Sequence, residues 1–490
     1  MNRLTIYADK DGPIINRHLY GHFAEHLGHC IYEGLWVGED SSIPNTRGIR
    51  DDVVAALRHI NIPNLRWPGG CFADDYHWRD GIGPRNERSG RVNTHWGNVV
   101  ETNHFGTHEF MDLCEQLACE PYICGNVGSG TVQEMRDWLE YMTFAGDSTL
   151  ANERRKNGQD APWALTYWGV GNENWGCGGN MRAEYYADEY RRFASYCRHF
   201  DDRKLYRIAG GPHDTDYYWT EVLMREAAPL MDGLSLHYYS LLQWEDKKSA
   251  TQFDEDEWFV LLKKALYMDT ILTQHSAIMD RYDSDRRVGL IVDEWGTWHA
   301  AEPDTNPAFL FQQNTLRDAL VAAVTLHIFH EHCERVHMAN IAQTVNVLQA
   351  MVLTEGEKMI LTPTYHVFEM FKAHQNATRL PILLQTDDYA YGDDAIPQIS
   401  ASASRSHTGE ILVTACNLNP HQAVDLTCSL DGIDVTSVAG RVLTGDAMNV
   451  FNTFDAPDVV SPVQFEQVAL NDGGLTMTLP AMSVVALVLT

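Results

Sequence analysis

The stretch LTYWGVGNENWG (residues 165–176) reads as a buried β-strand that ends in a polar stop. Its apolar, β-favouring run is followed by Gly171, and an amide and a carboxylate then stand side by side at Asn172 and Glu173. A strand of this kind places polar side chains at its carboxyl end. In parallel α/β folds that end carries the functional loops, so the pattern predicts both a fold and a site.

The same pattern of a short apolar run, a polar or Gly-rich stop and a helix-like stretch recurs along the chain. The apolar runs span residues 17–26, 62–71, 120–129, 165–174, 205–214, 233–240, 288–297 and 335–344. Stretches between them, such as AEYYADEYRRFASYCRHF, have the apolar spacing of amphipathic helices. Eight alternating units predict a (β/α)8 TIM barrel over residues 16–374. A doubly wound open sheet is the alternative, but no GxGxxG motif follows the first run.

After residue 375 the sequence changes character. Segments such as EILVTACNL, AVDLTCSL and LTMTLPAMSVVALVLT alternate apolar and polar residues and are separated by turn residues. Several short strands without a helical pattern predict a β-sandwich over residues 375–490. The opening strand RLTIYA precedes the barrel, and we expect residues 1–15 to pair into this sandwich.

The chain has 490 residues and a formal net charge of −30, which repels phosphate backbones and anionic lipid surfaces. We therefore expect neither nucleic acid nor membrane as a partner. No apolar run reaches the length of a membrane span, and Asp9, Lys10 and Asp11 interrupt the place of a signal-peptide core, so we expect a cytoplasmic protein. The ten Cys are scattered without CxxC pairs and are expected to be mostly buried thiols.

If the barrel forms, polar side chains from several strands meet at one mouth. They are Glu25, His26, Cys71, Asn172, Glu173, His237, Tyr239, Asp293, Glu294, Asn346 and Gln349. A single Glu after a strand is ordinarily a solvated helix cap. Two of them, from the fourth and seventh runs, with Asn, His and Tyr at neighbouring strand ends, instead indicate glycoside hydrolysis by a carboxylate pair.

We assign Glu173 as the general acid and base and Glu294 as the nucleophile. An acid that donates a proton near neutral pH needs a pKa above the ordinary ~4.3 of glutamic acid, and a carboxylate about 5 Å away supplies that shift. Esterification of the nucleophile then removes the negative charge, so the acid can serve as the base for water. Retention of configuration follows. Asn172 would hold the hydroxyl beside the reacting carbon, and Tyr239 would steady the nucleophile.

Longer motifs resemble a known family. GNEN (171–174), SLHYY (235–239) and VDEWG (292–296) are similar to the clan A retaining glycoside hydrolases, which carry acid/base and nucleophile on barrel strands four and seven. YGHFAEHLG (20–28), RWPGGCFADDYHWRDGIGPR (66–85) and MANIAQTVNVLQAM (338–351) resemble the family 51 α-L-arabinofuranosidases. The resemblance covers nearly the whole barrel, and the sandwich follows in the expected place.

This resemblance implies an exo-acting enzyme that releases terminal arabinofuranosyl residues from arabino-oligosaccharides, arabinan or arabinoxylan. It implies no cofactor and no metal, and a homo-oligomer such as a hexamer. Glu173 and Glu294 match the family's acid/base and nucleophile. The positions that match sugar-binding residues are Glu25, Cys71, Asn172, Tyr239 and Gln349.

Some of these assignments have alternatives. Gln343 competes with Gln349, and some relatives are expected to have Asn where this chain has Cys71. We include His237 as a substrate-binding residue because it stands, with Tyr239, at the end of the sixth run. Trp96, Trp298 and Trp175 are expected to stack on the aglycone or to shape the rim of the pocket, with ordinary packing beneath long loops as the alternative. The substrate-binding set predicted from the sequence is Glu25, Cys71, Asn172, His237, Tyr239, Gln349, Trp96 and Trp298.

Three other functions stay open at this point. The segments HIFHEHCERVH (327–337) and HFAEHLGH (22–29) suggest a metal-dependent barrel hydrolase, although barrel metal sites draw ligands from strand ends and HFAEH lacks the HExxH spacing. A non-catalytic carbohydrate-binding protein would be expected to lack one of the two Glu, and both are present. A β-D-xylosidase or β-glucanase would use the same mechanism on a ring with similar hydroxyl groups.

Overall fold

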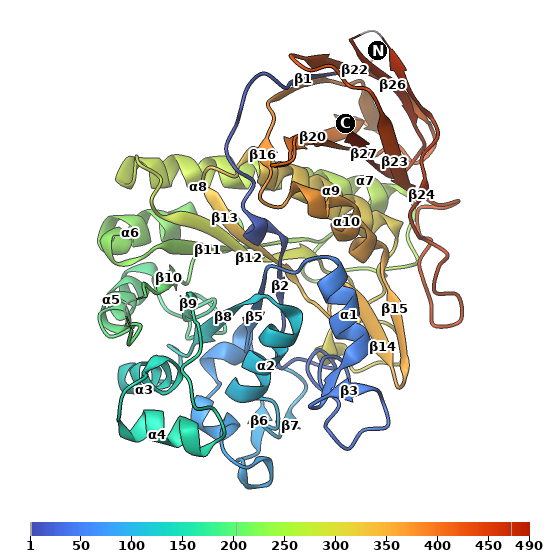
Figure 1. The fold of residues 1–490 in the computed structure, drawn as a ribbon. Coiled ribbons are helices and arrows are strands. Elements are labelled where there is room, and N and C mark those ends of the chain that lie inside the picture. Colours follow the sequence, from blue (N-terminus) through green and yellow to red (C-terminus); the bar gives the residue numbers. More distant parts are fainter. Residues whose placement is uncertain (1, 202, 472) are drawn as a thin grey trace.

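A closed barrel of eight parallel strands forms the centre of the computed structural model, which describes residues 2–201, 203–471 and 473–490 (Figure 1). Each barrel strand lies within one of the eight predicted runs, and β13 pairs with β2 to close the barrel. The TIM-barrel prediction is confirmed. The strands are β2 (Gly21–Phe23), β5 (Asn64–Trp67), β8 (Glu120–Gly125), β9 (Tyr167–Val170), β10 (Tyr206–Ala209), β11 (Gly233–Ser240), β12 (Gly289–Thr297) and β13 (Val336–Ala342).

Amphipathic helices surround the barrel. All but the last two have one buried face of Leu, Met and aromatic side chains, which packs on the strands, and one polar face, which meets solvent. The helices are α1 (Asp51–His59), α2 (Thr107–Leu117), α3 (Val132–Thr143), α4 (Thr149–Lys156), α5 (Ala183–Ala194), α6 (Tyr217–Ala227), α7 (Glu255–Leu266), α8 (Met268–Tyr282), α9 (Leu316–Glu331) and α10 (Pro363–Phe371).

The barrel interior has its own buried cluster. Tyr122, Ile208, Ile291 and Met338 come from four different strands and contact one another, as inward side chains of a TIM barrel do. Arg66 on β5 also lies in this interior, and its guanidinium carbon is 4.4 Å from the ring centre of Phe23. A charged residue here can be retained only because acidic groups at the mouth pair with it.

The C-terminal part forms two antiparallel-rich sheets. One has the order β17 (Ile382–Gln385), β1 (Asn2–Tyr7), β22 (Val424–Asp431), β26 (Gly474–Leu479) and β25 (Val468–Asn471). The other has the order β16 (Thr378–Arg379), β20 (Ile399–Arg405), β21 (Ile411–Asn417), β27 (Ser483–Leu489), β23 (Val438–Leu443) and β24 (Val463–Gln464). Their facing side chains form a second core, separate from that of the barrel. We propose 1–15, 16–374 and 375–490 as the domain divisions on this basis.

Helix α9 joins the two cores. It is buried nearly all round and lies between the barrel and the sheet of β20, β21 and β27 (Figure 1). Two of its histidines, His327 and His330, and His374 after α10 form an interdomain histidine cluster. Their ring nitrogens hydrogen-bond hydroxyl groups at 2.7 to 3.0 Å, chiefly Ser400, Ser402 and Ser404 on β20 and Thr414 on β21.

Two-stranded hairpins extend from the barrel loops. They are β3 (Asn45–Thr46) with β4 (Ile49–Arg50), β6 (Arg91–Asn93) with β7 (Val99–Glu101), and β14 (Val352–Glu355) with β15 (Lys358–Leu361), while β18 (Asp388–Tyr391) pairs with β19 (Asp394–Pro397). The β6–β7 hairpin brings Trp96 to the catalytic mouth. None of the helices in the described part of the chain combines the length and apolar character that a membrane span requires.

Candidate active site

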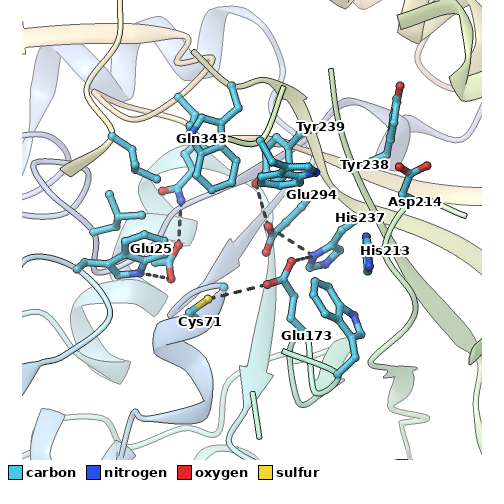
Figure 2. Close-up of a pocket in the computed structure, with 18 residues that line it drawn as sticks. Glu25, Cys71, Glu173, His213, Asp214, His237, Tyr238, Tyr239, Glu294 and Gln343 are labelled. Atoms are coloured by element: carbon cyan, nitrogen blue, oxygen red, sulfur yellow. Dashed lines mark hydrogen bonds and ion pairs between the residues drawn. The ribbon is translucent and has the colours of Figure 1, made fainter. Parts of the chain in front are cut away.

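A pocket of about 350 Å³ lies at the carboxyl ends of the barrel strands (Figure 2). Acidic side chains and aromatic rings dominate its wall, a combination suited to the hydroxyl groups and the apolar faces of a sugar. Its lining includes Glu25, Cys71, Trp96, Glu173, Trp175, His213, His237, Tyr239, Trp244, Glu294, Trp298 and Gln343.

Glu173 enters the pocket through a tight turn after β9. Gly171 and Glu173 have φ values of 86° and 42°, so the backbone takes the left-handed conformation twice within three residues. A non-glycine residue held there costs roughly 1–3 kcal/mol, and such residues cluster at functional sites. The turn brings Glu173 Oε1 to 2.8 Å from Nδ1 of His237.

Glu294 lies within β12 and faces Glu173 across the pocket. The Arg66 guanidinium donates to its Oε1 at 2.9 Å, and the Tyr239 hydroxyl donates to its Oε2 at 2.8 Å. An oxygen of Glu173 and an oxygen of Glu294 lie within 4.8 Å of each other. Carboxyl groups separated by about 5–5.5 Å belong to retaining rather than inverting glycosidases.

The electrostatic setting of the pair is unusual. Burial raises the pKa of Glu294 above its ordinary value, against the opposing positive charges of His237 and Arg66 and with a further contribution from Glu173. Burial works to lower the pKa of His237, but the surrounding Glu294, Asp293 and Glu173 carboxylates outweigh it and raise the pKa to about 10. The site therefore holds a histidine cation between acidic groups.

His237 lines the pocket, as a substrate-binding residue would. Its Nδ1 lies 2.8 Å from Glu173 and 3.5 Å from Glu294, and its Nε2 lies 3.2 Å from Asp293. Both ring nitrogens thus face carboxylates of the protein. A contact between His237 and the sugar stays a prediction.

Glu25 occupies the opposite side of the pocket from His237 (Figure 2). It accepts hydrogen bonds from Phe72 N at 3.1 Å, Trp96 Nε1 at 2.9 Å and Gln343 Nε2 at 3.0 Å. Burial, followed by repulsion from Glu294, raises its pKa to about 7. A Cβ on Gly70 would lie 2.9 Å from its Oε2, which explains the glycine in RWPGG.

Gln343, not Gln349, lines the pocket. Gln349 is fully buried, its Oε1 accepts from Thr297 N at 2.8 Å, and its Nε2 donates to Asp318 O at 2.7 Å. With both ends of its amide bound to protein, Gln349 supports β12 and α9 from behind. Of the two alternatives, Gln343 is the one that lies in the pocket lining, and a sugar contact by Gln349 stays a prediction that its position does not support.

Cys71 forms a disulfide bond with Cys177, with their Cα atoms 5.5 Å apart. The bond ties the loop after β5 to the loop after β9, beside the Glu173 carboxylate, whose Oε2 is 3.9 Å from Cys71 Sγ. A disulfide sulfur carries no proton, so Cys71 contacts the pocket without donating the hydrogen bond expected of a thiol. The other eight Cys are free.

The remaining predicted residues lie at or beside the pocket. Asn172 is buried next to Glu173, and its Oδ1 accepts from Arg66 Nη2 at 2.5 Å. Trp96 holds Glu25, as described above. Trp298 lines the pocket and packs edge-on against Tyr239 with ring centres 5.0 Å apart. Asn172 is thus linked to Glu294 through Arg66, which donates hydrogen bonds to both side chains.

Two groups of side chains at the pocket have the donor atoms of a metal site: Cys71, Glu173 and Cys177, and Glu173, His237 and Glu294. In the first, the sulfurs are bonded to each other and are not thiolates. In the second, the ring nitrogens of His237 already lie 2.8 Å from Glu173 and 3.2 Å from Asp293. The segment 327–337 contributes no residue to the described lining of the pocket, and its His327 and His330 bind hydroxyl groups instead.

Sequence reasoning missed Arg66, Cys177 and Trp244, whereas Trp175, which it named for the aglycone or the rim, lines the pocket. Arg66 lies within strand β5, where the sequence pattern predicts buried apolar residues and so did not identify a charged site residue. Trp244 is 54% exposed on the loop after β11, and its ring centre lies 5.5 Å from that of Trp298. An exposed Trp in a loop after a barrel strand is a usable signal for a sugar-binding wall.

Two adjacent carboxylates in a sugar-sized pocket, at the carboxyl end of a TIM barrel, define the class of the protein as a glycoside hydrolase. Comparison with known proteins agrees. Residues 56–257 match the α-L-arabinofuranosidase 1 domain, and residues 293–483 match the α-L-arabinofuranosidase C-terminal domain.

Individual relatives are similar over their whole length. An intracellular exo-α-L-arabinofuranosidase of Bacteroides ovatus is 51% identical, with 99% of this chain and 95% of the relative covered. The crystal structure of the GH51 arabinofuranosidase from Xanthomonas axonopodis pv. citri has a TM-score of 0.99 at 52% identity and covers 100% of this chain and 99% of that one. The arabinose complex of the Thermotoga maritima α-L-arabinofuranosidase has a TM-score of 0.88 at 29% identity and covers 100% and 99%. The chain belongs to glycoside hydrolase family 51, the α-L-arabinofuranosidases.

Proposed function

We propose that the protein removes terminal, non-reducing α-L-arabinofuranosyl residues from arabino-oligosaccharides, arabinan or arabinoxylan, with retention of configuration. The observation that carries this proposal is the pair of carboxylates on Glu173 and Glu294, whose oxygens approach within 4.8 Å. Family membership supplies the sugar, and the short separation supports double displacement.

The first half of the reaction uses the two carboxyl groups in opposite roles. Glu294 attacks the anomeric carbon while the proton of Glu173 moves to the leaving oxygen, so one C–O bond forms as another breaks. Tyr239 and Arg66 each hold one oxygen of Glu294, which fixes the direction of attack. The product is a glycosyl ester on Glu294.

The second half reverses the proton transfer. Glu173, now a carboxylate, takes a proton from water as the water oxygen attacks the anomeric carbon and the ester bond to Glu294 breaks. Two inversions at one carbon give net retention. The free arabinose leaves, and Glu173 again holds the proton.

Glu25 and Gln343 are our proposed ligands for the arabinofuranosyl hydroxyl groups. They are hydrogen-bonded to each other at 3.0 Å, and Trp96 donates to the same carboxylate. This group closes one end of the pocket, which supports exo action. Trp175, Trp244 and Trp298 line the pocket, and we assign this aromatic wall to the aglycone. The aglycone would be the remainder of an oligosaccharide or of a polymer.

Replacement of the two carboxylates tests the proposal. Glu294→Ala should reduce kcat/KM for 4-nitrophenyl α-L-arabinofuranoside by about a thousandfold or more, equal to about 4 kcal/mol. Azide should restore turnover and give the arabinosyl azide of inverted configuration. Glu173→Ala should lose little on an activated nitrophenyl leaving group and much on an alkyl one. Wild-type-like rates in Glu294→Ala would refute the mechanism.

The substrate is tested with a panel of glycosides, in the presence and absence of a chelator. We expect a preference for the α-L-arabinofuranoside over the β-D-xylopyranoside and the β-D-glucopyranoside, and no effect of the chelator. A preference for a pyranoside would retain the carboxylate mechanism and overturn the specificity.

We infer further that the protein acts in the cytoplasm as a homo-oligomer, such as a hexamer. The intracellular designation of the Bacteroides ovatus relative supports the location. Val92, Val99 and Val100 on the β6–β7 hairpin are 53%, 39% and 65% exposed, and exposed apolar side chains that gather in this way mark subunit contacts. Light scattering on the purified protein would establish the subunit number, and a monomer would refute the inference.

A further inference from the structure

His237 stands where three catalytic-site carboxylates converge. Glu173 follows β9, while Asp293 and Glu294 are consecutive residues of β12. The Nδ1 atom of His237 is 2.8 Å from Glu173 and 3.5 Å from Glu294, and Nε2 is 3.2 Å from Asp293 (Figure 2 draws the first two contacts). The ring is 4% exposed, so no bulk water competes for these bonds.

Asp293 fixes the protonation of one ring nitrogen. Its carboxylate accepts hydrogen bonds from Ser235 and from Tyr122, and Arg66 Nε lies 3.4 Å away. Although burial tends to raise the pKa of Asp293, Arg66 and His237 hold it well below the ordinary value. An ionised Asp293 can only accept a hydrogen bond, so Nε2 of His237 carries a proton.

The other ring nitrogen faces carboxylate oxygens as well. A neutral imidazole with its one N–H on Asp293 would leave Nδ1 unprotonated beside both Glu173 and the ionised nucleophile Glu294, and a proton on Glu173 would relieve only one of these two contacts. Two protons on the ring satisfy both contacts. The carboxylates outweigh the effect of burial and raise the pKa of His237 to about 10, in agreement with the geometry.

The sum of the formal charges in the cluster identifies the protonation state in which it is neutral. Two cations, Arg66 and His237, face the three carboxylates of Asp293, Glu294 and Glu173. With all five groups ionised, one negative charge remains in a buried site. A single proton on Glu173 makes the cluster neutral, which is the state that glycosyl transfer needs.

We propose that His237 is a positioning residue that keeps both ring protons throughout the catalytic cycle and sets the pH range in which Glu173 and Glu294 work. This inference rests on the function proposed above. His237 Nδ1–H holds Oε1 of Glu173, which leaves Oε2 for the proton that goes to the leaving group. After that transfer the same N–H stabilises the new carboxylate until water returns a proton to it.

The remaining groups around His237 leave this assignment intact. On its own strand, Tyr239 is a hydroxyl donor to Glu294. From the loop after β10, Asp214 donates its backbone N–H to the carbonyl oxygen of His237 at 2.8 Å. The ring contacts of His237 are therefore with the three carboxylates, and His213 in the neighbouring wall makes none of them.

The experiment compares His237→Asn with His407→Asn, an exposed histidine outside the pocket lining that serves as the matched control. The measurement is the pH dependence of kcat and of kcat/KM with 4-nitrophenyl α-L-arabinofuranoside. Removal of the buried cation favours the protonated form of both carboxylic acids. Both limbs of the profile should therefore move to higher pH by about 1–3 units in His237→Asn and stay in place in His407→Asn.

Three outcomes are distinguishable. Upward movement of both limbs, with kcat more affected than KM, supports the proposal. An unchanged profile with a raised KM would make His237 a sugar ligand, and a uniform loss of kcat without movement would make it merely structural; either result overturns the proposal. Azide rescue of Glu294→Ala tests the underlying mechanism separately, so failure of one is not failure of the other.

A measurement on the wild-type protein covers the case in which His237→Asn does not fold. In protein labelled with ¹⁵N-histidine, one imidazole should still show two protonated ring nitrogens at pH 9, because the pKa of His237 lies at about 10. Absence of an imidazolium signal at that pH would overturn the proposal.

Discussion

Mild acid should loosen the contact between the barrel and the sandwich through the interdomain histidine cluster. Burial lowers the pKa of His327 from 6.5 to about 3, and it lowers the pKa of His330 and His374 well below the ordinary value. The folded protein keeps these rings neutral, while the unfolded chain protonates them readily. Their stabilising contribution is therefore complete above pH 6.5 and is lost as the pH falls toward 3.

The size of the effect follows from the two pKa values of His327. At pH 5.5 the unfolded side chain is mostly protonated and the folded one is not, so about 1.4 kcal/mol of stability is lost, rising to about 2.7 kcal/mol at pH 4.5. His330 and His374 add to this loss in the same direction. Buried carboxyl groups such as Glu25, whose pKa is raised to about 7, also titrate between pH 7 and pH 5, so the contribution of His327 is read from the difference between the wild type and a variant without this ring.

The assay is the denaturation midpoint of the wild-type protein and of His327→Gln at several values between pH 7 and pH 5. The variant removes one titrating group and keeps hydrogen-bonding atoms for Ser400 and Thr414. It should be less stable at pH 7 and should lose less stability on acidification. His407→Gln, at an exposed position, is the control. An equal pH dependence of wild type and His327→Gln would refute the reasoning.

Three further changes test the site. Tyr239→Phe removes the 2.8 Å hydrogen bond to Glu294, and kcat/KM should fall by about tenfold or more because a hydrogen bond to a charged group contributes about 1.5–3 kcal/mol; an unchanged rate would contradict the role of the hydroxyl. Gln343→Ala should raise KM for the arabinofuranoside and release one bond on Glu25, and steady-state kinetics that match wild type would exclude it as a sugar ligand. Cys177→Ser should lower thermal stability by an amount equivalent to about 2–4 kcal/mol, and a reductant should lower the wild-type melting temperature but not that of the variant.

The strands of the barrel, and the place of Glu173 and Glu294 at its mouth, could be predicted from the sequence for one reason. A parallel strand buried on both faces leaves a continuous apolar run, and the polar residues that end this run stand at the mouth. Glu173 is the second such residue, after Asn172, and Glu294 is the second, after Asp293. Arg66 does not follow this rule, because it lies within the run of β5 and points into a barrel interior that the pattern treats as apolar.

Features that depend on the path of loops could not be predicted. Gln343 directly follows β13, whereas Gln349 comes after Asn346 and Leu348, which have φ values of 61° and 51°. These left-handed turns redirect the chain, and sequence gives little warning of them in residues other than Gly. The disulfide partner Cys177 was missed because the pairing of two loops is a property of the closed barrel, not of spacing along the chain.

Strand β1 pairs with strands that are made only after the barrel. Asn2 pairs with Leu426 and Tyr7 with Asp431, and β1 lies between β17 and β22 in a sheet whose other strands emerge from the ribosome after the entire barrel. During synthesis this segment stays unpaired until the barrel and the strands that follow it have been made. A fusion at the amino end would therefore hinder the late pairing of β1 with β22. A carboxyl-terminal truncation that removes β22 would leave β1 without this partner as well.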